Sequence, residues 1–334
     1  MTDTLNQEIA DTVRRMAKPA AAGGIGEHTA IEALVNNIAK VIFGKQEIIE
    51  LVVAATLGRG HVLLEDKPGV GKTMLARALA RSIGCSFKRI QCTPDLLPID
   101  ITGYVDPRST VFKPGPVFAN IVLADELNRA TPRTQSALLE AMGEGTVSVE
   151  GETHDLPNPF LIIATQNPIE HRGVNDLPEA QLDRFHLLLT PGYPSADEER
   201  HLMLDRQTHN PLDELETVIN IEQLRALIAI VPRVRLNEDL IDYILAIVHA
   251  TRASKLVELG ASPRCALQLM TLAQAYSLVN GRAYVIPDDI KFLAHHVLPH
   301  RIIPAVTSNE ALGTTDWKRE CIRRIVAEVK LPGL

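Results

Sequence analysis

The stretch LLEDKPGVGKTMLARALA, residues 63–80, constrains the fold of this chain more than any other. It joins a short apolar run, a loop with glycines and a helix-forming segment, which is the context that a phosphate-binding loop requires. The strict pattern G-x-x-x-x-G-K-[ST] fails at its first glycine, where the chain has Asp66. That position lies where the chain leaves the strand, furthest from the phosphates, and Asp tolerates turn geometry better than most residues. We therefore expect the loop to bind phosphate despite Asp66.

The rest of the loop is intact. In such a loop the backbone amides point at the phosphates, and the following helix adds its positive N-terminal end. Lys72 is expected to contact the β- and γ-phosphates, and the Thr73 hydroxyl is expected to bind Mg²⁺. An ordinary strand-turn-helix would not need a lysine at this helix start, where a cation opposes the helix dipole. The nucleotide-contacting residues predicted here are Pro68, Gly69, Val70, Gly71, Lys72, Thr73 and Met74.

A pair of carboxylates, Asp125 and Glu126, follows the apolar run in IVLADELNRA. Two carboxylates at the end of a buried strand repel each other and are costly unless a cation or a water network uses them. We expect Asp125 to bind Mg²⁺ through water, and Glu126 to orient and polarise the attacking water. The alternative is a pair of solvated acids at a strand end, which is disfavoured because the pair follows a phosphate loop.

Three further polar residues follow the same logic. Asn167 comes off the apolar run of FLIIATQNP, where its amide could hold the attacking water or the γ-phosphate, although a turn asparagine is the alternative. Arg184 precedes the last apolar run, in PEAQLDRF. Arg264 lies in the first turn of a helix that Ser262 caps and Pro263 begins, where the helix dipole opposes its charge. An anion within reach would explain that position, and a salt bridge to an acid is the alternative for both arginines.

Short apolar runs predict the strands of an α/β domain. Such runs suit strands that are buried on both faces of a parallel sheet, and they span residues 61–65, 87–92, 120–125, 159–165 and 185–190. Helical patterns separate several of them, which is typical of α/β domains. One of these helices is expected to be capped by Thr131, to have Pro132 in its first turn and to stop at Gly143.

After PGYPSADEER the pattern becomes all-helical. Five helices with plausible caps are predicted, over residues 220–230, 237–251, 262–279, 287–298 and 316–329. A length of 334 residues allows two domains with their own cores. We therefore predict a flexible N-terminal segment (1–27), an α/β nucleotide-binding domain (28–195), a linker (196–215) and a smaller helical domain (216–334).

Composition argues against several other classes of protein. A net charge of −7 argues against a protein that grips duplex DNA. None of the four cysteines forms a C-x-x-C pair, which argues against a zinc cage and a redox pair and favours a reducing cytoplasm. We expect neither a signal peptide nor a membrane span. The histidines of FLAHHVLPH lack an acid or cysteine at ligand spacing, so packed or surface positions are expected for His295, His296 and His300.

Together these motifs resemble the AAA+ ATPases, and within them the MoxR family, which is related to the motor subunits of magnesium chelatases. The most specific parts are LEDKPGVGKT, ITGYVDPRSTVFKPGPVFANIVLADELNRA, LLEAMGEGTVSVEGE and LPEAQLDRF. The resemblance implies a P-loop AAA+ domain, with a parallel sheet flanked by helices, followed by an all-helical lid domain. It also implies hydrolysis of ATP with Mg²⁺, and hairpins at 101–117 and 145–156 that face a ring pore or a partner.

The resemblance further implies a role for each motif residue: Lys72 and Thr73 in Walker A, Asp125 and Glu126 in Walker B, Asn167 as sensor 1, Arg184 as the arginine finger and Arg264 as sensor 2. The finger is expected to reach the γ-phosphate bound by a neighbouring subunit. An arginine supplied in this way can accelerate hydrolysis by orders of magnitude. A homo-oligomeric ring, expected to be a hexamer, is therefore implied.

The function implied is a cytoplasmic, chaperone-like ATPase that remodels, assembles or matures protein clients together with a von Willebrand A domain protein. One alternative is a chelatase motor subunit for metal insertion, which a copurifying chelatase partner would favour. Another is a nucleic-acid-associated ring ATPase, which salt-sensitive DNA binding would favour. A small-molecule kinase would not need Arg184, Arg264 or the helical domain. A nucleotide switch without turnover would not need Glu126 and Asn167.

Overall fold

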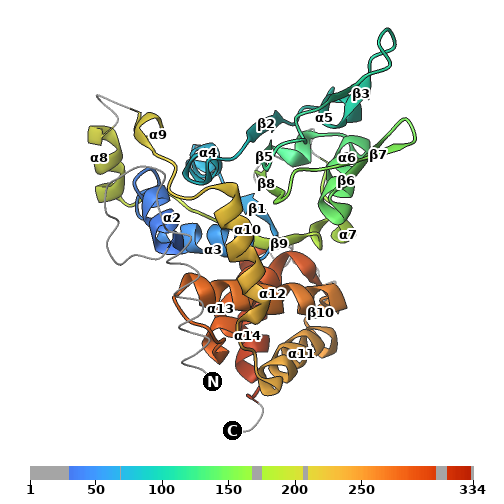
Figure 1. Cartoon of the computed structure of the whole chain (residues 1–334). Coiled ribbons are helices and arrows are strands. Elements are labelled where there is room, and N and C mark those ends of the chain that lie inside the picture. The colour runs from blue at the N-terminus through green and yellow to red at the C-terminus, as the bar shows by residue number, and fades with distance from the viewer. Residues whose placement is uncertain (1–29, 68, 168–174, 206–209, 306–313, 332–334) are drawn as a thin grey trace.

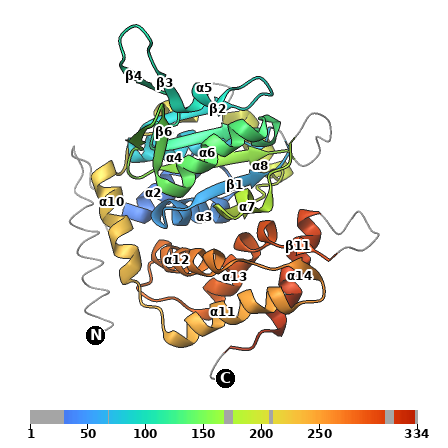
Figure 2. The same cartoon turned by 90° about the vertical axis from the view of Figure 1, so that its right-hand side faces the viewer.

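The computed structural model describes residues 30–67, 69–167, 175–205, 210–305 and 314–331. The predicted flexible segment 1–27 and Pro68 lie outside these residues. Figures 1 and 2 show an α/β domain stacked on a helical domain. The first contains a five-stranded sheet in the order β2-β5-β8-β1-β9. Its strands are β1 (His61–Glu65), β2 (Phe87–Gln91), β5 (Ile121–Asp125), β8 (Leu161–Gln166) and β9 (Phe185–Leu189).

The sheet is parallel throughout, which confirms the predicted fold class. Alternate residues of a strand point to opposite faces, so each face has its own core. On one face, Val62 and Leu64 pack with α2 (Ala30–Ala39), α3 (Gln46–Leu57) and α4 (Lys72–Ile83). On the other face, Leu63 packs with α6 (Pro132–Glu144) and with β6 (Thr146–Val149). The parallel sheet is thus covered by helices on both sides.

The helical domain contains the five predicted helices. They are α10 (Ile221–Ile230), α11 (Glu238–Ala253), α12 (Pro263–Val279), α13 (Pro287–Val297) and α14 (Thr315–Glu328). A small pair of strands, β10 (Val257–Leu259) and β11 (Ile303–Pro304), was not predicted because such short segments carry no periodic pattern. The segment predicted as a linker contains α8 (Ala196–Asp205) and α9 (Pro211–Glu214).

The hydrophobic core is continuous between the two domains. Helix α12 packs against α3 of the α/β domain, and α12 and α13 both pack against β9. Buried residues of the sheet, of α2 to α4 and of the helical domain form one cluster. The exact boundary between the domains therefore stays a prediction. No helix in the described ranges is long and apolar enough to cross a membrane.

The two edge strands of the sheet differ in burial, and the sequence prediction was wrong for one of them. Strand β2 has its Lys88, Arg89 and Gln91 side chains exposed, although its apolar run predicted burial on both faces. Strand β9 at the opposite edge is largely buried. The difference arises because α12 and α13 cover β9, and only an uncovered edge strand can keep charged side chains in water.

Helix α6 begins as predicted and ends later. The Thr131 side chain accepts a hydrogen bond from the backbone N–H of Thr134, and Pro132 is the first helical residue. The predicted stop at Gly143 is wrong, because the helix continues until Gly145, which has a left-handed φ of 67°. Gly143 makes room for a side chain instead: a Cβ added there would lie 2.1 Å from Nη1 of Arg184.

Both predicted hairpins are confirmed as antiparallel pairs. After the short helix α5 (Pro98–Thr102), β3 (Gly103–Val105) pairs with β4 (Phe112–Pro114). Strand β6 pairs with β7 (Glu152–Asp155). The β3–β4 hairpin projects from the end of the α/β domain that is remote from the helical domain (Figure 2). That the hairpins face a pore or a partner stays a prediction.

Candidate active site

The phosphate loop connects the end of β1 to the start of α4. Gly69 and Gly71 both have a φ of 87°, which glycine adopts without the steric cost other residues meet. Helix α4 begins at Lys72, and no side chain caps its N-terminus. The first N–H groups of a helix have no partner within the helix. This helix start therefore offers backbone N–H donors to an anion, as a phosphate loop must.

The loop forms one wall of a cavity of about 340 Å³ at the carboxyl ends of β1, β5 and β8. In open α/β sheets, ligands bind outside the carboxyl ends of the strands. The cavity is lined by Gly69, Gly71, Lys72, Thr73, Met74, Asp125, Glu126, Thr165, Gln166 and Asn167. The structure thus brings together the three predicted motifs, namely the loop, the carboxylate pair and Asn167. Val70 lies between the two glycines, and Pro68 is outside the described residues.

Lys72 is held at the mouth of the loop. Its Nζ donates a 2.7 Å hydrogen bond to the backbone oxygen of Asp66. Burial lowers the pKa of Lys72, while the Asp66, Asp125 and Glu126 carboxylates act in the opposite direction. The ammonium group therefore lies close to three carboxylates at the mouth of the loop.

Asp66, at the position of the missing glycine, has a structural role of its own. Its side chain is buried, and Oδ1 accepts a 2.7 Å hydrogen bond from the N–H of Lys67. Oδ2 accepts a hydrogen bond from the N–H of Gly192, in the segment after β9. Asp66 therefore fixes the start of the phosphate loop to a neighbouring segment, a role that local sequence could not reveal.

Asp125 at the end of β5 is bound from two sides. The Thr165 hydroxyl, on β8, donates a 2.7 Å hydrogen bond to Oδ1. Arg89, on β2, approaches Oδ2 with Nη2 at 2.6 Å and Nε at 3.1 Å. Neither of these two partners of Asp125 was predicted from the sequence. The only signal for Arg89 was a charged residue inside a run that was predicted to be buried.

Glu126 begins the turn after β5 and has a left-handed φ of 57°. Its N–H donates a 2.8 Å hydrogen bond to Oγ1 of Thr165. Its Oε2 accepts hydrogen bonds from Gln91 at 2.9 Å and from Arg129 at 3.1 Å. An unfavourable backbone conformation at a non-glycine residue is often found at functional sites. The neighbours hold Glu126 as an oriented acceptor on the cavity wall.

The two predicted arginines lie where the domains meet. Arg184 follows the short helix α7 (Glu179–Leu182), and its Nη1 donates a 2.9 Å hydrogen bond to the backbone oxygen of Leu139 in α6. Arg264 is the second residue of α12 and is exposed. Its charge contributes to a pKa of about 3 for His186, a shift caused mainly by burial. Arg264 thus lies in the first turn of α12, a helix that packs against β9.

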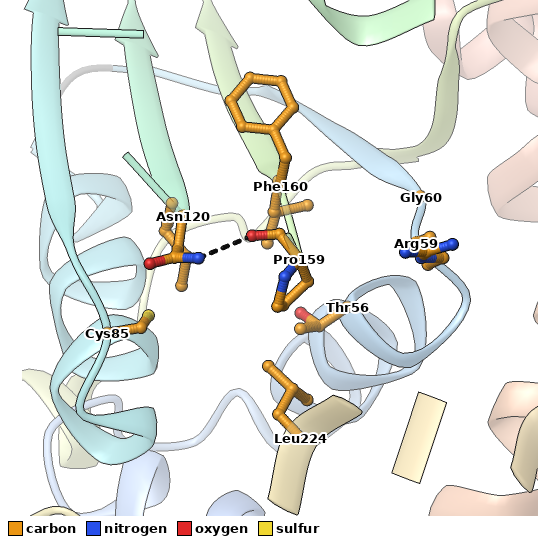
Figure 3. Close-up of a pocket in the computed structure, with 10 residues that line it drawn as sticks. Thr56, Arg59, Gly60, Cys85, Asn120, Pro159, Phe160 and Leu224 are labelled. Carbon is orange, nitrogen blue, oxygen red and sulfur yellow. Dashed lines mark hydrogen bonds between the residues drawn. The ribbon is translucent and has the colours of Figure 1, made fainter. Parts of the chain in front are cut away.

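A second hollow, at the amino ends of the strands, does not compete as a substrate site (Figure 3). Its volume is about 10 Å³, which is room for about one water molecule. The polar side chain of Asn120 at this hollow already has a protein partner, because its Nδ2 donates a 2.9 Å hydrogen bond to the backbone oxygen of Pro159. We regard this hollow as a packing gap.

His296 and His300, for which packed or surface positions were predicted, lie between secondary-structure elements. His300 is buried and its Nε2 contacts the backbone oxygen of Phe185 at 2.9 Å. His296 lies with Nε2 3.7 Å from a carboxylate oxygen of Glu47. Among the described residues, no group of three or more His, Cys, Asp or Glu side chains could hold a metal ion.

Fold and site together define a P-loop ATPase of the AAA+ class. The family described as "ATPase family associated with various cellular activities (AAA)" matches residues 61–187, and the AAA lid domain family matches residues 249–317. A crystal structure of a candidate ATPase from Cytophaga hutchinsonii matches with a TM-score of 0.84 and 33% identity, covering 97% of this chain and 98% of that one.

Proteins of similar sequence show to which family of AAA+ ATPases the chain belongs. The uncharacterized protein YeaC of Bacillus subtilis is 48% identical over 309 residues, which are 91% of this chain and 96% of YeaC. Chaperone MoxR1 of Mycobacterium tuberculosis is 40% identical over 330 residues, which are 95% of this chain and 86% of MoxR1. A magnesium-chelatase subunit ChlI homolog of Methanocaldococcus jannaschii is 28% identical, over 55% of this chain and 50% of its own length. The chain belongs to the MoxR family of AAA+ ATPases and is an ATP hydrolase.

Proposed function

We propose that this ATPase works as a hexameric ring and couples Mg²⁺-dependent ATP hydrolysis to the remodelling, assembly or cofactor maturation of protein clients. The observation that carries the proposal is the single cavity shared by the phosphate loop, the carboxylate pair and Asn167. The chaperone name of MoxR1, which this chain matches over most of its length, supports the kind of work that the energy is used for.

The donor set of the cavity fits ATP and Mg²⁺. The uncapped start of α4 supplies N–H groups for the phosphates, and Lys72 adds the cation. Thr73 and Asp125 supply the hydroxyl and carboxylate oxygens that Mg²⁺ prefers. When bound, Mg²⁺ neutralises charge on the phosphates. Glu126 is then the residue that orients and polarises the attacking water, and Asn167 holds that water or the γ-phosphate.

We assign Arg184 as the finger that reaches the nucleotide of a neighbouring subunit, and Arg264 as the sensor on the lid. Both guanidinium groups are carried by elements at the meeting of the two domains. Lid movement would therefore change the position of Arg264 relative to the sheet. The requirement for a second subunit follows from Arg184, and the number of six subunits is proposed from the family.

The partners proposed are a von Willebrand A domain protein and protein clients, in the cytoplasm. Nucleic acid is disfavoured because the turn of the β6–β7 hairpin carries the exposed residues Glu150 and Glu152, where a DNA-binding hairpin needs basic side chains. A chelatase motor is disfavoured because the chelatase-named relative matches only about half of this chain, whereas MoxR1 matches nearly all of it.

The test is ATP hydrolysis per subunit measured against protein concentration, with light scattering beside it, for the wild type and Arg184→Ala. We expect specific activity to rise with assembly, and to fall by at least about a thousandfold in the variant while ATP binding is retained. Activity that is independent of both protein concentration and Arg184 would mean that one subunit contains the whole active site, and it would contradict the proposed ring.

A further inference from the structure

The residues beside the two arginines are joined by one carboxylate. Asp183 immediately precedes Arg184 in the chain and is the C-terminal cap of α7. Its carboxylate accepts a hydrogen bond from the hydroxyl of Ser262, at 3.2 Å to Oδ1 and 3.0 Å to Oδ2. Ser262 lies two residues before Arg264. A single side chain therefore connects the segment of the α/β domain that carries Arg184 to the segment of the lid that carries Arg264.

Ser262 has two contacts with different consequences. Its Oγ accepts a 3.3 Å hydrogen bond from the N–H of Cys265, which makes it the N-cap of α12. The hydroxyl proton remains free to be donated to Asp183. Asp183 therefore helps to fix the direction of the first turn of α12. The base of the Arg264 side chain lies in that turn. Gln268, one turn further along α12, donates a weaker 3.4 Å hydrogen bond to the backbone oxygen of Asp183.

Arg301 completes the connection from η3 (Pro299–Arg301) of the lid. Its side chain is 1% exposed, and Nε lies 3.0 Å from Oδ1 of Asp183. The same guanidinium donates to the backbone oxygens of Phe185 and Val297 and to Oε1 of Gln268. A buried charge of this kind is tolerated only when its donors are satisfied. These acceptors, together with the backbone oxygen of His186 at 3.5 Å from Nη1, come from both domains. Arg301 is therefore fully satisfied only while the domains keep this arrangement.

We propose that Asp183, Ser262 and Arg301 are positioning residues that hold the base of Arg184 and the start of the Arg264 helix as one unit, so that a lid movement at one nucleotide site moves the arginine presented to the next subunit. The proposal rests on the proposed roles of Arg184 and Arg264. It adds the connection between them, and it identifies α7 and the start of α12 as the parts that must move together. Figure 2 shows α7 on the side of the α/β domain that faces the helical domain.

The decisive variant is Ser262→Ala, with two matched companions. Ser262→Thr keeps a hydroxyl that can both cap α12 and donate to Asp183, so it is expected to behave as the wild type. Asn220→Ala removes the side-chain cap of α10 in the same domain, without a contact to Asp183, and so reproduces the loss of a helix cap alone. Asp183→Asn serves as an independent change at the other end of the same hydrogen bond.

We expect Ser262→Ala to lower ATP turnover about tenfold, with a change of less than about threefold in the Kd for ATP, because a misplaced arginine affects the transition state more than ground-state binding. In an Arg264→Ala background, Ser262→Ala should cause a clearly smaller further loss than it causes in the wild type, because residues that act through one another are not additive. Turnover in Ser262→Ala equal to that in Asn220→Ala, or losses that multiply with Arg264→Ala, would overturn the proposal.

Hydrogen exchange provides a readout that does not need hydrolysis. In Glu126→Gln protein bound to ATP or ADP, segments 183–186 and 262–268 are expected to change protection together. With Ser262→Ala added, only the second segment should still respond to the nucleotide. Independent responses without that substitution would overturn the coupling, even where turnover is normal. Absence of ATP hydrolysis in the wild type would instead contradict the proposed function. The hydrogen-exchange result would then still test whether the Arg184 segment and the start of α12 move together.

Discussion

Gly143 and Arg184 occupy complementary space: the guanidinium of Arg184 lies across α6 at the point where Gly143 lacks a side chain. Its Nη1 donates a 2.9 Å hydrogen bond to the Leu139 backbone oxygen, and a Cβ on Gly143 would lie 2.1 Å from this nitrogen. A glycine inside a helix costs about 1 kcal/mol relative to alanine. Its presence here allows the close approach of an arginine that the reaction is proposed to need.

Gly143→Ala is therefore expected to separate stability from activity. The clash involves the end of a flexible side chain, so the arginine can turn away, and the helix gains up to about 1 kcal/mol from alanine. We expect an unchanged or higher midpoint of thermal unfolding, and ATP turnover lowered about tenfold because the arginine is displaced. The measurement is turnover and thermal unfolding on the same preparations. Wild-type turnover in this variant would show that the position of Arg184 along α6 has no role in hydrolysis.

Lys72→Ala is expected to weaken ATP binding by about ten- to a hundredfold, because a charge-assisted contact to phosphate contributes about 1.5–3 kcal/mol. Lys67→Ala is the matched control, since Lys67 is an exposed lysine of the same loop that lies over the ring of Tyr193. Titration with a fluorescent ATP analogue measures both. Equal affinities in the two variants would contradict the assignment of Lys72.

Glu126→Gln is expected to retain ATP binding and to lower turnover by about a hundredfold or more, which is the usual contribution of a positioned general base. The amide keeps the size of the side chain and can still contact Gln91. Single-turnover hydrolysis with bound ATP measures the chemical step directly. A variant that hydrolyses at the wild-type rate would transfer the role of general base to another residue.

Acid pH is expected to destabilise the protein through His61 and His186. Burial lowers the pKa of His61 to about 4 and that of His186 to about 3. In the unfolded chain both have ordinary values near 6.5, so below that pH the unfolded state binds more protons, and stability falls as pH falls. The slope should approach about 1.4 kcal/mol per pH unit for each histidine, until the pH reaches the folded-state pKa.

Urea unfolding at several pH values between about 8 and about 5 measures this loss. His186→Gln supplies the control, because an amide can still accept the 3.2 Å hydrogen bond from the N–H of His61 but does not titrate. The variant should show a shallower dependence on pH than the wild type. A free energy of unfolding that stays constant across this range would contradict the neutral, buried state of both rings.

Local sequence patterns were enough to predict the main strands and helices and most of the cavity. Short apolar runs predicted all five strands of the sheet, and helix caps such as Thr131, Asn220 and Ser262 marked helix starts correctly. The loop, the carboxylate pair and Asn167 were predicted separately, and they meet because the carboxyl ends of parallel strands share one edge of the sheet. Such features are local: periodicity, caps and glycines act through bonds and neighbours within a few residues.

Which polar groups are buried, and what they contact, became clear from the three-dimensional arrangement of the chain. Arg89 and Arg301 are the same residue type, yet one pairs with Asp125 on an open sheet edge and the other is enclosed between two domains. Gly143 matches the pattern of a helix stop in the sequence, but in the structure it lies inside α6, beside the side chain of Arg184. Burial and pairing of this kind depend on segments far apart in the chain, because the free energy of a charged group is set by its surroundings, which no local pattern contains.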